Sequence, residues 1–300
     1  MGSFFKQLYR YTHKRPFRHN ENLWPYMRIS RAPSGEIISL IFRGQTVPIV
    51  DLSSLAAAHS GPIMLTATGP SVKNIRFKTP ASFPAMGVNG AWSLGNVVDF
   101  KFYVIVDMGF FDQRPEMIAE IVADPQLTLF TTAHGIARII DRLSLARIRC
   151  RLALIEDAAF KIFQPKIPAS ELGRCYANVR SASFAENRPD IGFTTDIRHG
   201  IFDAGTVAYW ALQIAAYLGF SEMYIVGLDM NNFNKPRFYE SENNKLPSFL
   251  AESFEDLIVP AFTHASNQLK KNNIRVVNLS LQSAIPSQIF EKADYHQVFY

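Results

Sequence analysis

The sequence predicts an α/β protein built on one doubly wound, mainly parallel sheet, and three observations support this. Short apolar runs alternate with segments of helical spacing, which is the pattern of strands joined by crossover helices. Five of these runs end in small, hydrogen-bonding or acidic residues. Hydrophobic residues make up 48% of the 300 residues, an ordinary fraction for a protein with a real core. The length suits one large domain with additions or two small ones.

The first 58 residues are expected to form a basic, aromatic arm and a hairpin, ahead of a main domain at 59–300. Residues 1–32 combine seven lysines and arginines with seven aromatic residues, which is typical of an interfacial anchor on anionic lipid. An arm packed on the domain or on a second subunit explains this composition equally well. Residues 36–50 predict strand and hairpin structure, and residues 52–59 predict a short helical linker.

The main domain is predicted to begin with a strand and glycine turn at residues 62–71, PIMLTATGPS. Ser71 follows the turn, where we expect it to cap a helix. The later predicted strands are 84–90, 102–106, 126–130, 223–226 and 274–278. The predicted helices are 113–123, 135–149, 206–218 and 249–269, with Gly219 ending the third, and residues 165–198 are expected to be irregular.

In a parallel sheet the strand ends share one edge, outside which ligands bind. The residues expected on this carboxyl edge are Thr68–Ser71, Asn89, Gly90, Asp107, Thr132–His134 and Asp229. Asp107 is a candidate for binding a sugar or base, and capping of the next turn is the alternative. For Asp229 a turn-forming role is an equal alternative to ligand binding. Because five strands end in such residues, the sequence favours a ligand-binding site at this edge of the sheet.

Several kinds of chemistry lack their sequence signals. The first strand is not followed by GxGxxG or GxxxxGK[ST], and GxSxG, HExxH and a strand-end Asp-x-Asp are also absent. These absences leave a nucleotide site that uses no metal and no further cofactor. Cys150 and Cys175 have no metal-ligand spacing and suggest a reduced, cytoplasmic setting. No apolar run is long enough to span a bilayer, so we expect a soluble or peripheral protein.

Residues 231–247, NNFNKPRFYESENNKLP, follow the Asp229 strand end and predict a lid, which we place at about 231–256. Arg237 and Tyr239 give this loop anchoring side chains, and Arg237 is a candidate phosphate clamp. The helix that follows carries Glu252, Glu255 and His264. At helical spacing Glu252 and Glu255 share a face.

The order of these motifs resembles the bacterial CMP-sugar-dependent glycosyltransferases of the sialyltransferase type (glycosyltransferase family forty-two). It is still closer to the lipopolysaccharide-core Kdo transferases of the WaaZ type. The matching segments are ATGPS at 67–71, VNGAW at 88–92, YVIVDMGFF at 103–111, DAGTVAYWALQIAAYLGF at 203–220, YIVGLD at 224–229 and RFYESENNKLPS at 237–248. The resemblance covers roughly residues 60–285 and implies a single Rossmann-like, variant GT-A-like domain with a lid over the donor.

The resemblance implies transfer of a 2-keto sugar acid from its CMP ester to a sugar hydroxyl, with inversion and without a metal. Donor-binding positions carried over from it are Gly69, Pro70, Ser71, Asn89, Asp107, Gly205 and Thr206. Thr68 stands where the sialyltransferases have asparagine, and Asn231 lies near the position of a second phosphate-binding tyrosine of that family. Gly90, Asp229 and Arg237 join the candidate donor-binding residues from the sequence pattern. Tyr239 matches a lid tyrosine that supports the departing phosphate. We expect backbone N–H groups near Gly69 and Thr206 to assist it. The family's catalytic histidine has no counterpart after the lid, so Glu252, Glu255 and His264 are the candidate bases.

Three functions follow from this reading. The first is a transferase that moves Kdo from CMP-Kdo to a lipopolysaccharide inner-core sugar at the cytoplasmic face of the inner membrane. The second is a sialyltransferase that uses CMP-sialic acid. The third is a catalytically silent glycolipid-binding protein of the same fold, and a pterin pyrophosphokinase-like enzyme is a more distant alternative. The expected partners are the CMP-sugar donor, a glycolipid acceptor and an anionic membrane surface at residues 1–32, with no nucleic acid; a homo-oligomer is left open.

Overall fold

The computed structural model describes residues 3–77 and 83–300, so residues 1–2 of the predicted arm and 78–82 of the predicted domain lie outside it. Contacts divide the chain into two compact units. One contains residues 1–55 and 105–202, and the other contains residues 56–104 and 203–300. Both units are discontinuous in sequence.

The second unit carries most of the large sheet. Its strands are β4 (Pro62–Thr66), β5 (Ala85–Val88), β6 (Phe100–Ile105), β11 (Glu222–Val226), β12 (Arg275–Asn278) and β13 (Glu291–Lys292). Its helices are α6 (Val207–Leu218), α7 (Leu250–Ser253), α8 (Val259–Lys271) and α9 (Tyr295–Phe299), with 3₁₀ segments η3 (Pro70–Asn74) and η4 (Asn89–Leu94) and a π-helical turn η8 (Phe254–Ile258). Helix α6 packs on β4 and β5, and α8 packs on β12.

The strand order β13-β12-β11-β4-β5-β6-β7-β8 confirms a doubly wound, Rossmann-like sheet. The pairs β11–β4, β4–β5, β5–β6, β11–β12, β12–β13 and β7–β8 are all parallel. Strands β5 to β8 follow on one side of β4, and strands β11 to β13 follow on its other side. The order in which strands are added to the sheet therefore switches at the parallel β4–β11 pair, where Pro62 to Thr66 lie opposite Glu222 to Val226. In open α/β sheets ligands bind outside the strand ends at this switch point.

The first unit contains the arm and the remaining strands. Its strands are β1 (Met27–Arg31), β2 (Ile37–Phe42), β3 (Gln45–Thr46), β7 (Thr128–Thr131), β8 (Arg151–Leu154), β9 (Ala182–Ala185) and β10 (Arg188–Thr194). Its α-helices are α1 (Ser3–Thr12), α2 (Met108–Gln113), α3 (Pro115–Ala123), α4 (Ala133–Leu143) and α5 (Leu172–Cys175). Short 3₁₀ segments complete it at Arg15–Asn20, Leu52–Leu55, Leu145–Arg147, Ala169–Glu171 and Ile197–His199. The arm forms an antiparallel sheet in the order β1-β2-β3.

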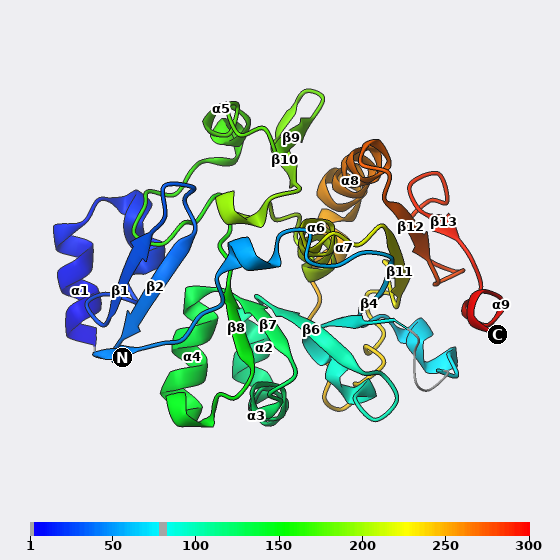
Figure 1. The fold of residues 1–300 in the computed structure, drawn as a ribbon, viewed down its shortest axis with the longest axis horizontal. Coiled ribbons are helices and arrows are strands. Elements are labelled where there is room, and N and C mark those ends of the chain that lie inside the picture. The colour runs from blue at the N-terminus through cyan, green and yellow to red at the C-terminus, as the bar shows by residue number, and fades with distance from the viewer. Residues whose placement is uncertain (1–2, 78–82) are drawn as a thin grey trace. The chain divides into compact units, whose positions relative to one another are not determined.

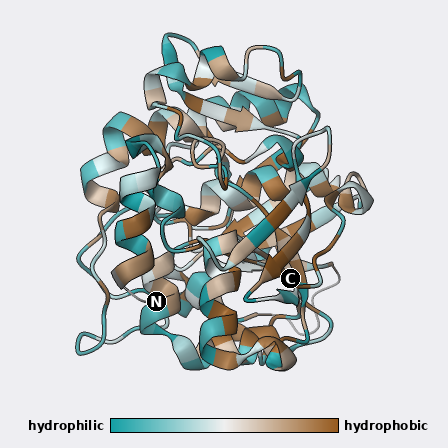
Figure 2. Cartoon of the chain, turned by 90° about the vertical axis from the view of Figure 1, so that its left-hand side faces the viewer, coloured by the Kyte–Doolittle hydropathy of each residue, from teal (hydrophilic) through white to brown (hydrophobic). Residues whose placement is uncertain are grey.

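Hydrophobic patterning accounts for the regular elements. Strand β4 is buried at every position from Ile63 to Thr66, as expected for a strand covered on both faces. Many of the longer helices carry alternating hydrophilic and hydrophobic bands, which is the pattern of one face on a core (Figure 2). Helix α6 ends at Gly219 with φ +99°, the left-handed C-terminal cap that the sequence predicted.

Some predicted elements are wrong in detail. The stretch 165–198 is not wholly irregular, because it contains α5 and the hairpin β9–β10. The helix predicted at 249–269 is three segments, α7, the π-helical turn η8 and α8. Helices α1, α2 and α9 and strands β1, β8 and β13 were not predicted from the sequence.

Candidate functional site

Two loops meet at the switch point of the sheet. The turn after β4 and the turn after β11 are joined by a hydrogen bond from the Gly69 N–H to the Gly227 carbonyl, at 2.9 Å. The Asp229 carboxylate accepts the backbone N–H of Ser71 at 2.8 Å and its hydroxyl at 2.5 Å. Asp229 is only 6% exposed. This aspartate therefore fixes the conformation of the glycine turn.

This geometry corrects two expectations for the turn. Gly69, not Ser71, occupies the N-cap position of η3, and Pro70 is the first residue of that segment. The N–H groups of Gly69 and Ser71 donate within the chain, so they are not available to a phosphate in this conformation. The turn consequently contributes shape to the carboxyl edge and not a set of phosphate donors.

Ser280 belongs to the same cluster and was not identified from the sequence. Its hydroxyl lies 3.0 Å from the Ser71 hydroxyl, and its backbone N–H donates to the Asn278 side-chain oxygen at 3.0 Å. Both residues are buried at the end of β12. The predicted strand 274–278 with its polar last residue was the only available signal.

A second cluster forms where β5 ends. Asn89 adopts a left-handed backbone conformation with φ +46°, and its carbonyl accepts the Tyr103 hydroxyl at 2.6 Å. Burial raises the pKa of Tyr103 well above its ordinary value, so this hydroxyl stays protonated and donates. The side-chain oxygen of Asn89 is buried and has no hydrogen-bond partner within the described residues. An unsatisfied buried acceptor at a strand end is a candidate ligand contact.

The lid tyrosine lies against this cluster. A Cβ atom on Gly90 would lie 2.1 Å from Cε1 of Tyr239, so only glycine leaves room for the ring. The lid also contacts the glycine turn, because the Phe238 N–H donates to the Thr68 carbonyl at 3.2 Å. The predicted loop, residues 231–247, contains no helix or strand.

Arg237 and Glu240 organise the lid from inside. The Arg237 guanidinium pairs with the Glu240 carboxylate at 3.0 Å, and its backbone N–H donates to the same carboxylate at 2.9 Å. The Leu246 N–H donates to this carboxylate at 3.3 Å, and Glu240 is only 6% exposed. Arg237 thus makes a structural ion pair, and its predicted role as a phosphate clamp stays a prediction.

The start of α6 is the other donor-binding position carried over from the resemblance. Gly205 has φ +73°, and Thr206 is the N-cap residue without a side-chain capping bond. The Asp203 carboxylate accepts the Gly205 N–H at 3.1 Å and the Trp210 indole N–H at 2.7 Å. The N-terminus of this 12-residue helix has the partial positive charge that favours an anion.

The candidate bases differ in exposure. Glu252 on α7 and Glu255 in the π-helical turn are exposed, whereas His264 on α8 is 7% exposed. Because the π-helical turn begins after Ser253, the α-helical spacing expected between the two glutamates does not apply. Such π-helical segments occur frequently at functional sites.

Two further predicted residues have local partners. Asp107 is exposed and caps α2 by accepting the Gly109 N–H at 2.8 Å, which is the capping alternative. It lies in the first unit, and a ligand-binding role stays a prediction. The Asn231 amide donates to the Gln282 carbonyl. Among residues 3–77 and 83–300, no group of three or more His, Cys, Asp or Glu could hold a metal ion.

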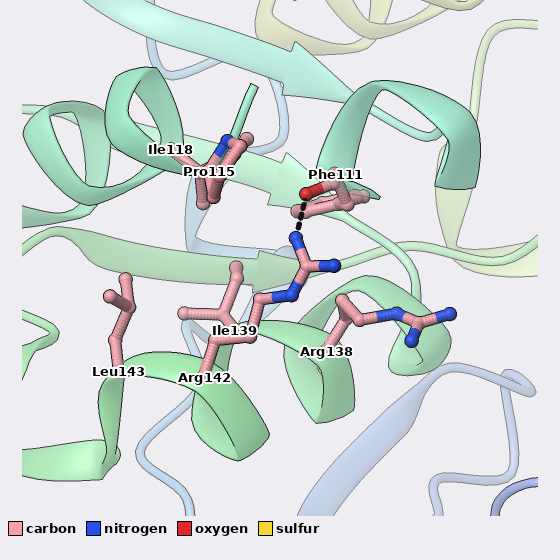
Figure 3. A pocket seen from close by; sticks show the side chains of 7 residues that line it. All are labelled: Phe111, Pro115, Ile118, Arg138, Ile139, Arg142 and Leu143. Carbon is pink, nitrogen blue, oxygen red and sulfur yellow. Dashed lines mark hydrogen bonds between the residues drawn. The ribbon is translucent and has the colours of Figure 1, made fainter. Parts of the chain in front are cut away.

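One small pocket lies in the first unit among α2, α3 and α4 (Figure 3). Arg142 closes it by donating to the Phe111 carbonyl, and the other lining residues are Pro115, Ile118, Arg138, Ile139 and Leu143. Its volume is about 10 Å³, close to the least that one water molecule needs. This pocket cannot take a sugar nucleotide.

The sheet and its switch-point cluster define a Rossmann-like α/β protein whose candidate ligand edge is formed by the carboxyl ends of β4, β5 and β11. A family model described as 3-deoxy-D-manno-octulosonic acid transferase WaaZ matches residues 49–294. The chain belongs to this family of Kdo transferases. It is therefore a Kdo-type glycosyltransferase of lipopolysaccharide biosynthesis.

Curated relatives agree with this assignment. A probable 3-deoxy-manno-octulosonic acid transferase of Salmonella typhimurium is 27% identical over 247 residues, covering 78% of this chain and 87% of that protein. A probable transferase of the same description from Escherichia coli is 25% identical over 231 residues, covering 75% and 80%. Among solved structures, the sialyltransferase CstII from Campylobacter jejuni, in complex with a substrate analogue, cytidine-5′-monophosphate, aligns with 77% of this chain and 84% of its own. That alignment has 12% identity and a TM-score of 0.40.

Proposed function

We propose that the enzyme transfers Kdo from CMP-Kdo to a sugar of the lipopolysaccharide inner core, with inversion and without a metal ion. The observation that carries this proposal is the buried side-chain oxygen of Asn89, which has no hydrogen-bond partner within residues 3–77 and 83–300 and lies beside Gly90 and the lid tyrosine. Leaving a buried acceptor unpaired costs roughly 1–3 kcal/mol, so the site gains when a ligand supplies a donor. The cytosine amino group or a ribose hydroxyl of CMP provides such a donor.

The leaving group determines what the remaining residues do. As the bond from the sugar to the CMP phosphate breaks, negative charge builds on the phosphate. In this proposal the Tyr239 hydroxyl and the N-terminus of α6, which begins after Thr206, stabilise that charge, whereas the Gly205 N–H is engaged by the Asp203 carboxylate. The glycine turn at Gly69 forms part of the same edge. It does not donate to the phosphate, because the N–H groups of Gly69 and Ser71 already donate to Gly227 and Asp229.

A base must also take the proton of the acceptor hydroxyl. Glu252 and Glu255 are exposed, so an acceptor arriving from outside can meet either carboxylate without movement of the chain. His264 is buried and needs α8 to open before it reaches an acceptor. We therefore place the two glutamates ahead of the histidine as the base. Lid closure over the donor excludes water that would otherwise hydrolyse it.

The test is CMP release by the purified enzyme with CMP-Kdo and a water-soluble, deacylated inner-core acceptor. Product mass identifies the transferred sugar, and a parallel reaction with CMP-sialic acid separates the two donors. Calorimetry with CMP, and with ATP and magnesium, provides an independent readout of nucleotide binding. Absence of CMP release with both donors would refute the transferase, and preference for CMP-sialic acid would refute the Kdo assignment.

A separate variant tests the role of the Asn89 side chain. Asn89→Gly keeps the left-handed backbone and removes only the side chain, since glycine adopts positive φ freely. We expect CMP binding to weaken roughly tenfold, the value of one hydrogen bond to a buried group. Asn187→Gly is the matched control, because Asn187 has φ +57° in the exposed β9–β10 turn. Equal CMP affinity in both variants contradicts the role of Asn89.

We also propose that the enzyme works peripherally at the cytoplasmic face of the inner membrane, where residues 1–32 meet anionic lipid. The part of the chain that the structure describes has no helix long and apolar enough to cross a bilayer. Residues 1–32 carry seven basic residues against Glu21 alone, a formal charge of +6, whereas the whole chain carries +5. The excess positive charge is thus concentrated in this arm, which favours an anionic surface.

A further inference from the structure

The first helix has three distinct faces. In an α-helix each residue is rotated by about 100° from the last, so residues four and seven positions apart share a face. Phe5 and Tyr9 form one face, which packs inward. Phe4, Leu8 and Tyr11 form a second face, which we call the outer stripe. The third face carries Lys6 and Arg10.

The inward face is held by aromatic contacts. The ring of Phe5 lies 6.1 Å from that of Trp24 and 5.7 Å from that of Tyr26, and the Tyr9 ring lies 5.8 Å from Trp24. Tyr9 is 1% exposed. Arg10 adds a bidentate ion pair with Glu21, with bonds of 2.7 and 2.8 Å. These contacts dock α1 beside β1 and β2 (Figure 1) and thereby determine which way the outer stripe faces.

The outer stripe is mostly exposed, and within the described residues its ring contact is the edge-on contact of Phe4 with Phe5, at 5.5 Å between ring centroids. Phe4 is 68% exposed, Leu8 37% and Tyr11 89%, although all three side chains are large and apolar or aromatic. The ring contacts from α1 to Trp24 come from Phe5 and Tyr9 and not from these three residues. Isolated exposed apolar residues are ordinary, but three on one helical face of a ten-residue helix form a patch that marks an interaction site.

Exposed positive charge directly follows the stripe. Lys14, Arg15 and Arg18 lie within six residues after α1 and are exposed, and within the described residues no ion pair is formed by any of them. The pKa of Glu21 is nevertheless lowered by Arg10 and, to a lesser degree, by the charge of Arg18. A helix with exposed aromatic and leucine side chains beside unpaired basic residues has the chemistry of an element that lies in the interface of an anionic bilayer. The aromatic rings enter the acyl boundary and the basic groups meet the lipid phosphates.

A second copy of this chain is the competing occupant. A two-fold symmetric contact would place the same patch on itself, and with it two arms that each carry a formal charge of +6. Like charges across an interface oppose association. The charge therefore favours anionic lipid over self-association. The family match begins at residue 49, so the family relationship assigns nothing to α1.

We propose that the outer stripe of α1, Phe4, Leu8 and Tyr11, is the part of the enzyme that inserts into the membrane interface, with Lys14, Arg15 and Arg18 binding anionic headgroups. This inference rests on the proposed peripheral association and names the side chains that carry it out. It holds independently of which sugar the enzyme transfers.

The test is co-sedimentation of the full-length protein with phosphatidylglycerol-containing vesicles and with pure phosphatidylcholine vesicles. The variant Phe4→Gln/Leu8→Gln/Tyr11→Gln keeps strong helix formers and removes the stripe. We expect its affinity for anionic vesicles to fall at least about tenfold, since burial of even one such side chain contributes about that factor. Tyr300→Gln is the matched control, because Tyr300 is also 68% exposed and lies at the other end of the chain.

A charge variant tests the second half of the proposal. Lys14→Gln/Arg15→Gln/Arg18→Gln should lose about a hundredfold in affinity for anionic vesicles at low salt, roughly fivefold for each basic group near the surface. Its control is Lys270→Gln/Lys271→Gln, which removes two exposed lysines at the end of α8. Wild-type binding should also weaken as salt rises.

The outcomes separate this inference from the proposed function. Equal vesicle binding by the stripe variant and wild type overturns the stripe, and failure of the wild type to bind anionic vesicles overturns the membrane proposal as well. A dimer in analytical ultracentrifugation that the stripe variant abolishes identifies self-association instead. CMP release with the deacylated acceptor is measured in parallel. Its absence would refute the transferase reaction while leaving the vesicle result to decide the inference.

Discussion

Replacing Gly69 by alanine should strain the contact between the glycine turn and Asp229 that shapes the switch point. Gly69 has φ −64° and ψ 154°, a conformation open to alanine, so any effect comes from the added methyl group alone. That carbon would lie 2.5 Å from Cγ and Oδ2 of Asp229 and 2.6 Å from the Gly227 carbonyl oxygen. Normal contact distance is about 3.5 Å, so the loops must separate by roughly 1 Å.

The separation acts directly on the bonds from Ser71. The Asp229 carboxylate accepts the Ser71 N–H at 2.8 Å and its hydroxyl at 2.5 Å, so its movement weakens both. Hydrogen bonds to charged groups contribute roughly 1.5–3 kcal/mol each, and overpacking costs about 1–3 kcal/mol, so we expect a loss of about 2–4 kcal/mol in the free energy of unfolding. CMP affinity should fall with it, because the turn forms part of the proposed donor edge.

Urea unfolding followed by circular dichroism measures the stability, and calorimetry measures CMP affinity. Gly95→Ala is the control, since Gly95 has φ −57° and the nearest atom to an added Cβ lies 3.1 Å away. In a double-mutant cycle, Gly69→Ala should cost less when Asp229→Ala is already present, by more than about 1 kcal/mol. The reasoning is refuted if Gly69→Ala changes stability by less than about 0.5 kcal/mol and leaves CMP affinity unchanged.

Two further predictions concern the lid and the thiols. Tyr239→Phe keeps the ring against Gly90 but removes the hydroxyl, so kcat should fall roughly 10²–10³-fold while the KM for the donor changes little; steady-state kinetics check this. Burial raises the pKa of the Cys150 thiol from 9.0 to about 12, so at pH 8 a thiol reagent should label only the exposed Cys175 in the native protein and both thiols in urea.

Each of these has a clear contrary result. Tyr224→Phe is the control for the tyrosine, because it removes a hydroxyl bonded to Glu222 on β11, and equal kcat losses in both variants would contradict the lid assignment. For Cys150 the folded pKa lies above the unfolded value. The native state therefore holds this proton more tightly, and the associated stability is complete below pH 9 and declines as pH rises toward 12. Equal labelling rates for both native thiols would contradict the burial argument.

The parallel sheet could be predicted because its central strands are continuous apolar runs. Strands β4 and β6 are buried over nearly their whole lengths, and such runs between turn residues are recognisable without knowledge of their neighbours. Strand β8 was missed because the predicted helix 135–149 runs almost up to its first residue, whereas in the structure α4 ends at Leu143. The hairpin β9–β10 was missed because every residue of β9 is only half-buried, so the strand lacks a clear hydrophobic alternation.

The carboxyl edge could also be predicted, but the partners on it could not. Alternation of strands and helices implies a parallel sheet whose strand ends share one edge, so Gly69, Asn89 and Asp229 were correctly placed just after strands. The bond from Ser71 to Asp229 joins residues 158 positions apart, and it arises only because β4 and β11 are neighbours. Ser280 enters the cluster for the same reason, since β12 pairs with β11.

The reason for glycine at positions 69 and 90 of the proposed donor edge becomes clear only from the fold. In the sequence, Asn89-Gly90 looks like an ordinary turn in which glycine supplies the left-handed conformation. In the structure the positive φ belongs to Asn89, and the absence of a side chain at Gly90 instead makes room for the Tyr239 ring. Gly69 likewise has an ordinary φ and makes room for Asp229. Both positions need glycine because a side chain from a distant part of the chain occupies the space, so lid and turn contacts constrain the sequence at each strand end.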